Sequence, residues 1–130
     1  MKFQLDEQQG SNSISRHETN RVWVNGRPHG SSLLVPWRGE VQGWGVGRFE
    51  DLDEPAFERI LALKPELVIF GSGERLRFVP PARYRALIEA RIGLETMDLA
   101  AACRTYNVLA AEGRAVLAAL LIEGTEPPQG

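Results

Sequence analysis

The sequence contains one cysteine, Cys103, and this scarcity excludes two kinds of stabilising site. A single cysteine cannot form an intramolecular disulfide, and it cannot supply a zinc site that needs several thiolates. The two histidines, His17 and His29, have no cysteine, aspartate or glutamate at the spacing of metal ligands. The sequence therefore predicts no metal site.

A strong charge imbalance and a long apolar run are also missing. The sequence has 15 Lys and Arg residues and 17 Asp and Glu residues, which gives a net charge of -2. No basic field is therefore expected to attract nucleic acid. The longest apolar run, residues 115–122, is much shorter than the roughly twenty residues that span a bilayer. The N-terminus carries Asp6 and Glu7 and lacks the apolar core of a secretion signal. We expect a soluble, cytoplasmic protein with no membrane span and no nucleic-acid partner.

The composition is that of one ordinary globular domain. The chain has 130 residues, of which 43% are hydrophobic and 25% are charged. Residues 13–123 are expected to form a single α/β domain, because no repeat or linker divides them. The polar ends, residues 1–12 and 124–130, are expected to be flexible.

The first half of the chain has the pattern of strands. Residues 21–24 alternate in polarity and are rich in β-branched and aromatic side chains. Asn25 and Gly26 follow, a pair that suits the positive φ angles of a two-residue hairpin turn. Residues 31–35 are expected to form a second strand. The alternating glycines of residues 41–47 are typical of a kinked strand or of a loop packed closely on its neighbours.

Beyond residue 53 the hydrophobic period becomes helical. Three helices are expected, at residues 54–63, 81–91 and 98–112. Strands are expected between and after them, at residues 67–70, 94–97 and 114–122, and residues 76–79 are a candidate for a further short strand. Residues 115–122 of the last strand are all apolar, which indicates a central position. The sequence therefore predicts an α/β (α+β mixed) fold, layered β/α with a mixed central sheet, N-terminal antiparallel strands and about three helices.

Residue types at the helix ends support these boundaries. Asp53 and Pro55 are typical of a helix start, and Asp98 can cap the third helix. Gly93 and Gly113 are expected just past the ends of the second and third helices.

A glycine turn after the strand at 67–70 is the most function-like feature. Gly71 and Gly73 free backbone N–H groups to approach a phosphate or carboxylate. The dinucleotide-binding pattern fails, however, because Leu76 stands where a third glycine is needed, and Phe70 breaks the pattern of a serine-hydrolase elbow. The alternative is a tight turn with a purely structural role.

Thr96 and Asp98 follow the next strand and are expected to lie beside this turn if the two strands are neighbours. Ligands of open α/β sheets bind at the carboxyl ends of strands. Asp98 has an alternative duty as a helix cap. The candidate cleft, for a ligand or a partner, comprises Gly71, Ser72, Gly73, Thr96, Asp98, Arg104, Thr105 and Asn107. No catalytic residue is assigned.

Cys103 and the tryptophans are the remaining candidates. Cys103 lies on the apolar face of the third helix, so we expect it to be buried and unreactive. Trp23, Trp37 and Trp44 suit either the core or, where partly exposed, a partner surface.

Several segments carry a family resemblance. They are VNG at 24–26, LVIFGSG at 67–73, ETMD at 95–98, AACRTYNVL at 101–109 and EGR at 112–114. In this order they resemble the Mth-type domain family of unknown function, over about residues 14–122. The family includes uncharacterised bacterial and archaeal proteins and a mitochondrial assembly factor of respiratory complex I. The resemblance implies a layered β/α fold around a mixed sheet, no established enzymatic activity and no cofactor.

Two hypotheses of function follow. The first is a non-enzymatic protein-interaction or assembly factor, whose partner is another protein. The alternative is a domain that binds a small anionic ligand, or an undetected enzyme, with a cleft at the strand ends.

Overall fold

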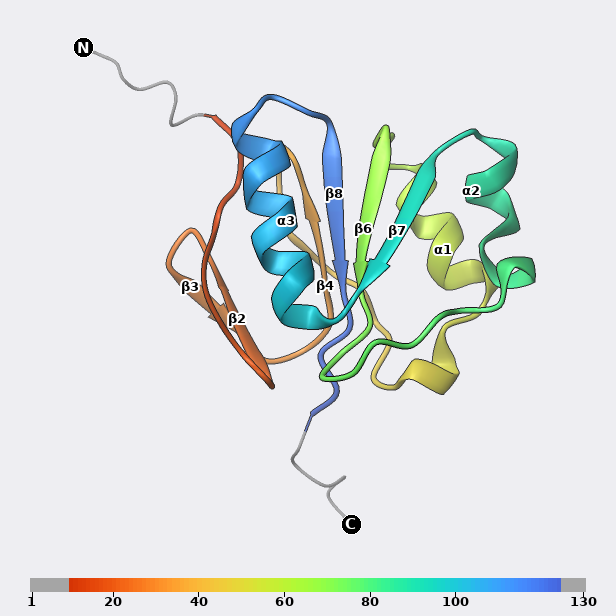
Figure 1. The fold of residues 1–130 in the computed structure, drawn as a ribbon, viewed down its shortest axis with the longest axis horizontal. Coiled ribbons are helices and arrows are strands. Elements are labelled where there is room, and N and C mark those ends of the chain that lie inside the picture. Colours follow the sequence, from red (N-terminus) through yellow and green to blue (C-terminus); the bar gives the residue numbers. More distant parts are fainter. Residues whose placement is uncertain (1–9, 125–130) are drawn as a thin grey trace.

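The computed structural model describes residues 10–124, which form two sheets and three α-helices (Figure 1). The smaller sheet is antiparallel and contains β1 (Ile14–Glu18), β2 (Arg21–Val24) and β3 (Arg27–His29). The larger sheet contains β4 (Leu33–Pro36), β5 (Gln42–Gly43), β6 (Leu67–Gly71), β7 (Gly93–Met97) and β8 (Val116–Leu120). The α-helices are α1 (Glu54–Leu61), α2 (Arg85–Glu89) and α3 (Leu99–Ala111), and the short 3-10 helices are η2 (Phe49–Asp51) and η3 (Pro81–Tyr84). The predicted fold class is confirmed.

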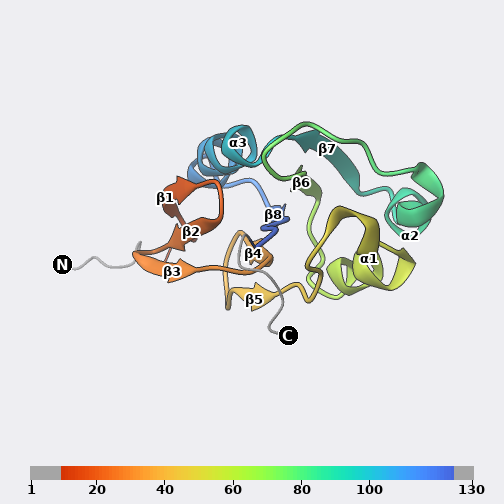
Figure 2. The same ribbon diagram turned by 90° about the horizontal axis from the view of Figure 1, so that it is seen from below.

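The order of the larger sheet is β5-β4-β8-β6-β7, with β8 at its centre as predicted. β6 is parallel to both β7 and β8, whereas β4 is antiparallel to β8. Every residue of β8 is buried, because elements cover both faces of the sheet. In Figure 2, α3 and the smaller sheet lie on one side of β8, and α1 lies on the other side.

Two hydrophobic cores occupy these two faces. Alternate residues of β8 point into them: Val116, Ala118 and Leu120 join the core under α3, and Leu117 and Ala119 join the core under α1. This period of two is that of a strand buried on both sides.

The hairpin turn is where the sequence places it, but its second strand is not the one expected. Asn25 and Gly26 have φ angles of 52° and 86°. The strand that pairs with β2 is β3, and the strand predicted at 31–35 is β4, which belongs to the other sheet. Of residues 41–47, only Gln42–Gly43 form a strand.

The helices confirm most of the expected boundaries. The Asp53 side chain accepts a hydrogen bond from the Ala56 N–H at the start of α1, and Gly113 has a φ of 86° after α3. The helix predicted at 81–91 is shorter, because its first turn is η3. Gly93 is the first residue of β7 and does not cap α2; Arg91, with a φ of 61°, makes the left-handed turn.

The candidate strand at residues 76–79 is not formed, because these residues make an irregular segment that leads to η3. Most of the flexible ends predicted at 1–12 and 124–130 lies outside the described residues, which begin at 10 and end at 124. Within the described part, Asn12 is hydrogen-bonded to the segment after β4, with its N–H 2.9 Å from the Trp37 carbonyl oxygen. Between residues 10 and 124, no helix is long and apolar enough to cross a membrane.

Candidate functional site

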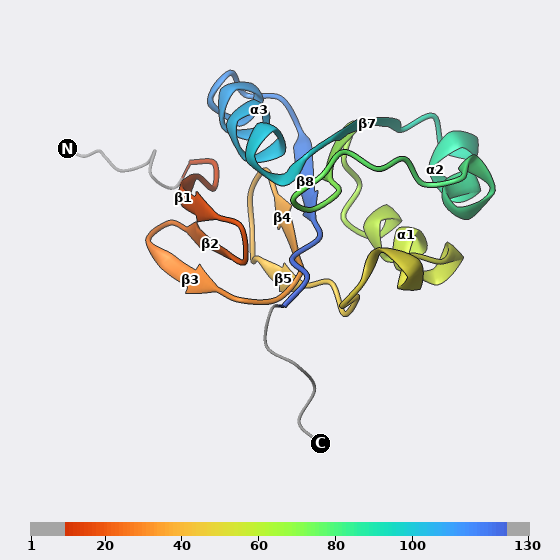
Figure 3. The same cartoon turned by 60° about the horizontal axis from the view of Figure 1, so that its bottom comes forward.

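The glycine turn and the start of α3 meet at the carboxyl ends of β6 and β7 in the larger sheet, as the sequence suggests. β6 and β7 are parallel neighbours, with Gly71 opposite Met97. The Ser72 N–H donates to the Met97 carbonyl (2.8 Å), and the Leu99 N–H donates to the Gly73 carbonyl (2.7 Å). Figure 3 shows this end of the sheet, where the loop after β6 passes beside the start of α3.

Gly71 has a packing role at this end of the sheet. A Cβ atom at this position would lie 3.0 Å from the Ala102 Cβ and 3.3 Å from the Leu99 Cα. Only glycine therefore lets α3 pack this closely on β6.

Ser72 is fully buried, and its polar groups serve the turn itself. Its hydroxyl donates to the Arg75 carbonyl (2.7 Å) and accepts from the Arg77 N–H (2.9 Å). Its carbonyl oxygen accepts from the Arg77 guanidinium at 2.7 Å and 3.2 Å. This network gives Ser72 a structural role.

Arg77 also joins the glycine turn to the segment that follows β8. Its guanidinium donates to the Glu123 carboxylate (2.7 Å) and lies 4.7 Å from the Phe49 ring centroid. Partial burial of Glu123 on its own would raise the pKa of its carboxyl. The hydrogen bonds from Arg77 and the Phe49 N–H, with the charges of Arg77 and Arg75, outweigh burial and lower that pKa. Sequence reasoning missed this ion pair, and a separation of 46 residues leaves no local pattern that could reveal it.

Gly73 and Asp98 line a pocket of about 310 Å³ at this end of the sheet. The other lining residues come from the end of β1 and the turn after it, the glycine turn and the start of α3: His17, Glu18, Thr19, Glu74, Leu99 and Ala100. Asp98 also caps α3, because its side chain accepts from the Ala101 N–H (2.8 Å). The Glu18 carboxylate is paired with Arg16 (2.6 Å), so Glu74 and Asp98 supply the remaining negative charge of the pocket, which repels an anion and favours a cationic group. The charge of this pocket therefore argues against a small anionic ligand.

The remaining candidate residues lie apart from this pocket. Thr96 is half-buried within β7, opposite Phe70, and Arg104 is exposed on α3. The described residues that line the pocket do not include Thr96, Arg104, Thr105 or Asn107. The Asn107 amide instead holds β1, since it accepts from the Ile14 N–H and donates to the Ile14 carbonyl, both at 2.8 Å.

Cys103 and Tyr106 lie in the core between α3 and the sheet. The Tyr106 hydroxyl donates to the Pro36 carbonyl (3.0 Å), and burial raises its pKa. Cys103 is fully buried as predicted, and burial raises the pKa of its thiol to about 12, although the charge of Arg104 opposes this effect. Within residues 10–124, no group of three or more His, Cys, Asp or Glu side chains is placed to hold a metal ion.

We expect Cys103 to react slowly with a thiol reagent in the folded protein. Only the thiolate is nucleophilic, and at neutral pH a buried thiol with this pKa is almost entirely protonated. Labelling with dithionitrobenzoate, with and without denaturant, measures the difference. Stoichiometric labelling of the folded chain at the rate of the unfolded chain contradicts the expectation.

Similar proteins cover almost the whole fold. The NADH dehydrogenase [ubiquinone] 1 alpha subcomplex assembly factor 3 of Bos taurus is 37% identical over 120 residues, which is 90% of this chain and 61% of that protein. The Homo sapiens protein of the same name is 32% identical with the same coverage. This chain thus spans about 61% of the length of these curated relatives.

Solved structures show the same fold. A Bordetella parapertussis crystal structure has a TM-score of 0.82 and 32% identity, covering 88% of this chain and 98% of that one. A Bordetella pertussis solution structure, described as a Mth938-like domain, has a TM-score of 0.76 and 26% identity, covering 95% and 94%. The family described as "Protein of unknown function (DUF498/DUF598)" matches residues 14–121. The chain belongs to this DUF498/DUF598 family, the Mth-type family that its motifs resemble.

Proposed function

We propose that the chain is a non-enzymatic protein-interaction domain that acts as an assembly factor for a larger complex. The observation that carries the proposal is the 37% identity, over 90% of the chain, to a protein named as an assembly factor of NADH dehydrogenase. The structural roles of Ser72, Cys103 and Asn107 support it, because each of these side chains serves packing or the backbone.

The acidic pocket at the strand ends is the proposed partner contact. It is lined by Glu18, which is paired with Arg16 (2.6 Å), and by Glu74 and Asp98, whose charges suit a basic side chain of a partner. Mutation of an exposed charge at the rim of an interface slows association with little effect on the fold. We therefore choose Glu74, which is exposed, for the test.

The test uses the tagged full-length chain in its native organism, with a strain that lacks its gene. We expect loss of the gene to lower the amount of assembled NADH dehydrogenase, and cross-linking to capture subunits of that complex. Glu74→Lys should reduce capture, and Glu58→Lys, an exposed position on α1, serves as the matched control. Unchanged complex in the deletion strain, with no captured subunit, overturns the proposal. We also propose a cytoplasmic location, and fractionation of cells that carry the tagged chain tests it.

A further inference from the structure

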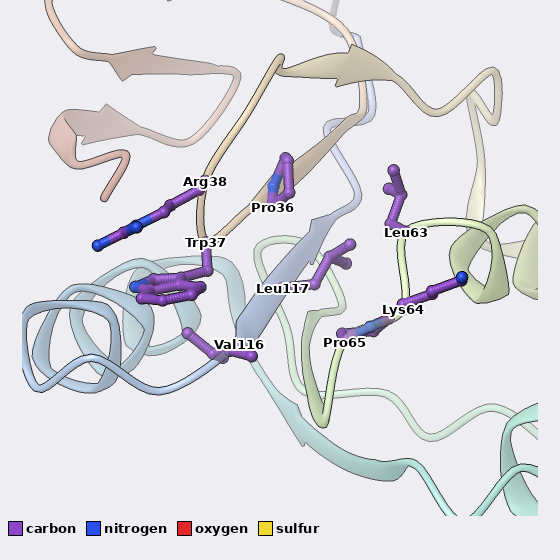
Figure 4. Close-up of a pocket in the computed structure, with 9 residues that line it drawn as sticks. Pro36, Trp37, Arg38, Leu63, Lys64, Pro65, Val116 and Leu117 are labelled. Carbon is purple, nitrogen blue, oxygen red and sulfur yellow. The ribbon is translucent and has the colours of Figure 1, made fainter. Parts of the chain in front are cut away.

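A second pocket, which we call the Trp37 pocket, lies at the other end of the strands of the larger sheet, away from the glycine turn. Three segments form it: the end of β4, the residues before β6 and the start of β8 (Figure 4). These strands are adjacent, with Pro36 opposite Leu117 and Leu67 opposite Val116. Its volume is about 230 Å³.

The floor of the Trp37 pocket is apolar and its wall is held in place. Pro36, Pro65, Val116 and Leu117 are buried, and the half-buried side chains of Trp37 and Leu63 rise beside them. The Trp37 indole N–H donates to the Ala110 carbonyl (3.3 Å), which fixes the ring against the end of α3. The pocket is therefore formed before any partner arrives, which lowers the entropic cost of binding.

The rim of the pocket is positively charged. Arg38 and Lys64 are exposed, and Figure 4 shows them on opposite sides of the apolar centre. The Arg38 guanidinium lies 4.4 Å from the Trp37 ring centroid, which keeps it at the rim. None of the nine described lining residues carries a carboxylate. The carboxylate of Glu66, beside Pro65 in sequence, is occupied by Arg114 at 3.2 Å.

We propose that the Trp37 pocket binds an extended partner segment in which one apolar side chain is flanked on both sides by acidic residues. The apolar side chain fills the pocket, and the flanking carboxylates contact Arg38 and Lys64. The volume of 230 Å³ is below the roughly 300–1,000 Å³ of small-molecule sites, so it suits a single anchoring side chain. This inference rests on the proposed function, and it names the chemistry of the partner.

The test is a titration of the isotopically labelled full chain, followed by NMR, with the peptide Glu-Glu-Phe-Glu-Glu. We expect shifts of the Trp37 indole and of the Val116 and Leu117 methyl resonances. Because each exposed ion pair contributes modestly, reversal of both charges in Arg38→Glu/Lys64→Glu should weaken binding roughly tenfold. The control Arg27→Glu, on exposed β3, should bind as the wild type does. A peptide with Lys in place of Glu should produce no shift.

Four results overturn the inference: no shift at millimolar peptide, equal affinity in the double variant, equal shifts with free benzoate, or the same shifts on concentration of the protein alone. Benzoate would indicate a small-ligand site, and the concentration effect would indicate a second copy of the chain. If peptides fail but the cell experiment still captures subunits, only the Trp37 pocket is wrong. If the peptide binds as stated but gene deletion has no effect, only the proposed assembly function is wrong.

Discussion

Replacement of Trp44 by alanine is expected to lower the free energy of unfolding by about 4 kcal/mol, within the range measured for large aromatic side chains in cores. Trp44 is 2% exposed. Its ring meets Phe57 and Phe70 edge-on, with centroid distances of 5.8 Å and 6.0 Å. Its indole N–H donates to the Ala56 carbonyl (2.9 Å), so the variant loses packing and leaves that acceptor without this donor.

Urea unfolding followed by circular dichroism measures this loss without relying on tryptophan fluorescence. The matched control is Trp23→Ala, because Trp23 is half-buried on β2 under the guanidinium of Arg16, at 4.5 Å. That variant should lose about 1 kcal/mol, which is typical of a side chain away from the core. Equal losses in the two variants would show that Trp44 does not support the core under α1.

The central part of the fold was predictable because its strands and helix ends are determined by residues close together in the sequence. Residues 67–70 and 115–122 are continuous apolar runs, and such runs form strands covered on both faces. Asp98 and Gly113 bound α3 through a side-chain cap and a positive φ, both of which depend on near neighbours.

Elements stabilised by distant partners were not predictable. β1 and β3 are mostly exposed and polar, so they carry little hydrophobic pattern. β1 forms because β2 pairs with it and because Asn107, 93 residues away, binds both backbone groups of Ile14. Residues 76–79 resemble a strand in composition, but Arg77 turns inward to bind Ser72 and Glu123, and the segment pairs with no strand of the described chain.

The candidate site likewise has one part that local sequence patterns predict and another part that depends on distant segments. The adjacency of Gly71 and Met97 follows from two neighbouring parallel strands, which the alternation of helix and strand indicates. The acidic pocket also needs Glu18, the last residue of β1, and no local pattern in the sequence places it beside the glycine turn. The Trp37 pocket needs residues near 37, 64 and 116 together, and only the order of the strands in the sheet supplies that.

Replacement of Gly71 by valine is the second change with a large expected effect, and it separates the two interpretations of the glycine turn. A Cβ atom at Gly71 would already lie 3.0 Å from the Ala102 Cβ and 3.2 Å from the Leu120 Cδ2, and valine adds two methyl groups. Overpacking of this kind costs about 3 kcal/mol, because α3 must move away from β6.

The matched control is Gly43→Val, since a Cβ atom at Gly43 meets no atom within 4 Å. That variant should unfold within about 0.5 kcal/mol of the wild type, as most surface substitutions do. Thermal unfolding of both variants, together with the capture of NADH dehydrogenase subunits, gives the answer. If Gly71→Val is as stable as the wild type and no longer captures subunits, the turn contacts a partner directly. Glycine is then not required for the close packing of α3 on β6. If it loses stability and the folded fraction at low temperature still captures subunits, the glycine serves the fold, and the acidic pocket beside it remains available to the partner.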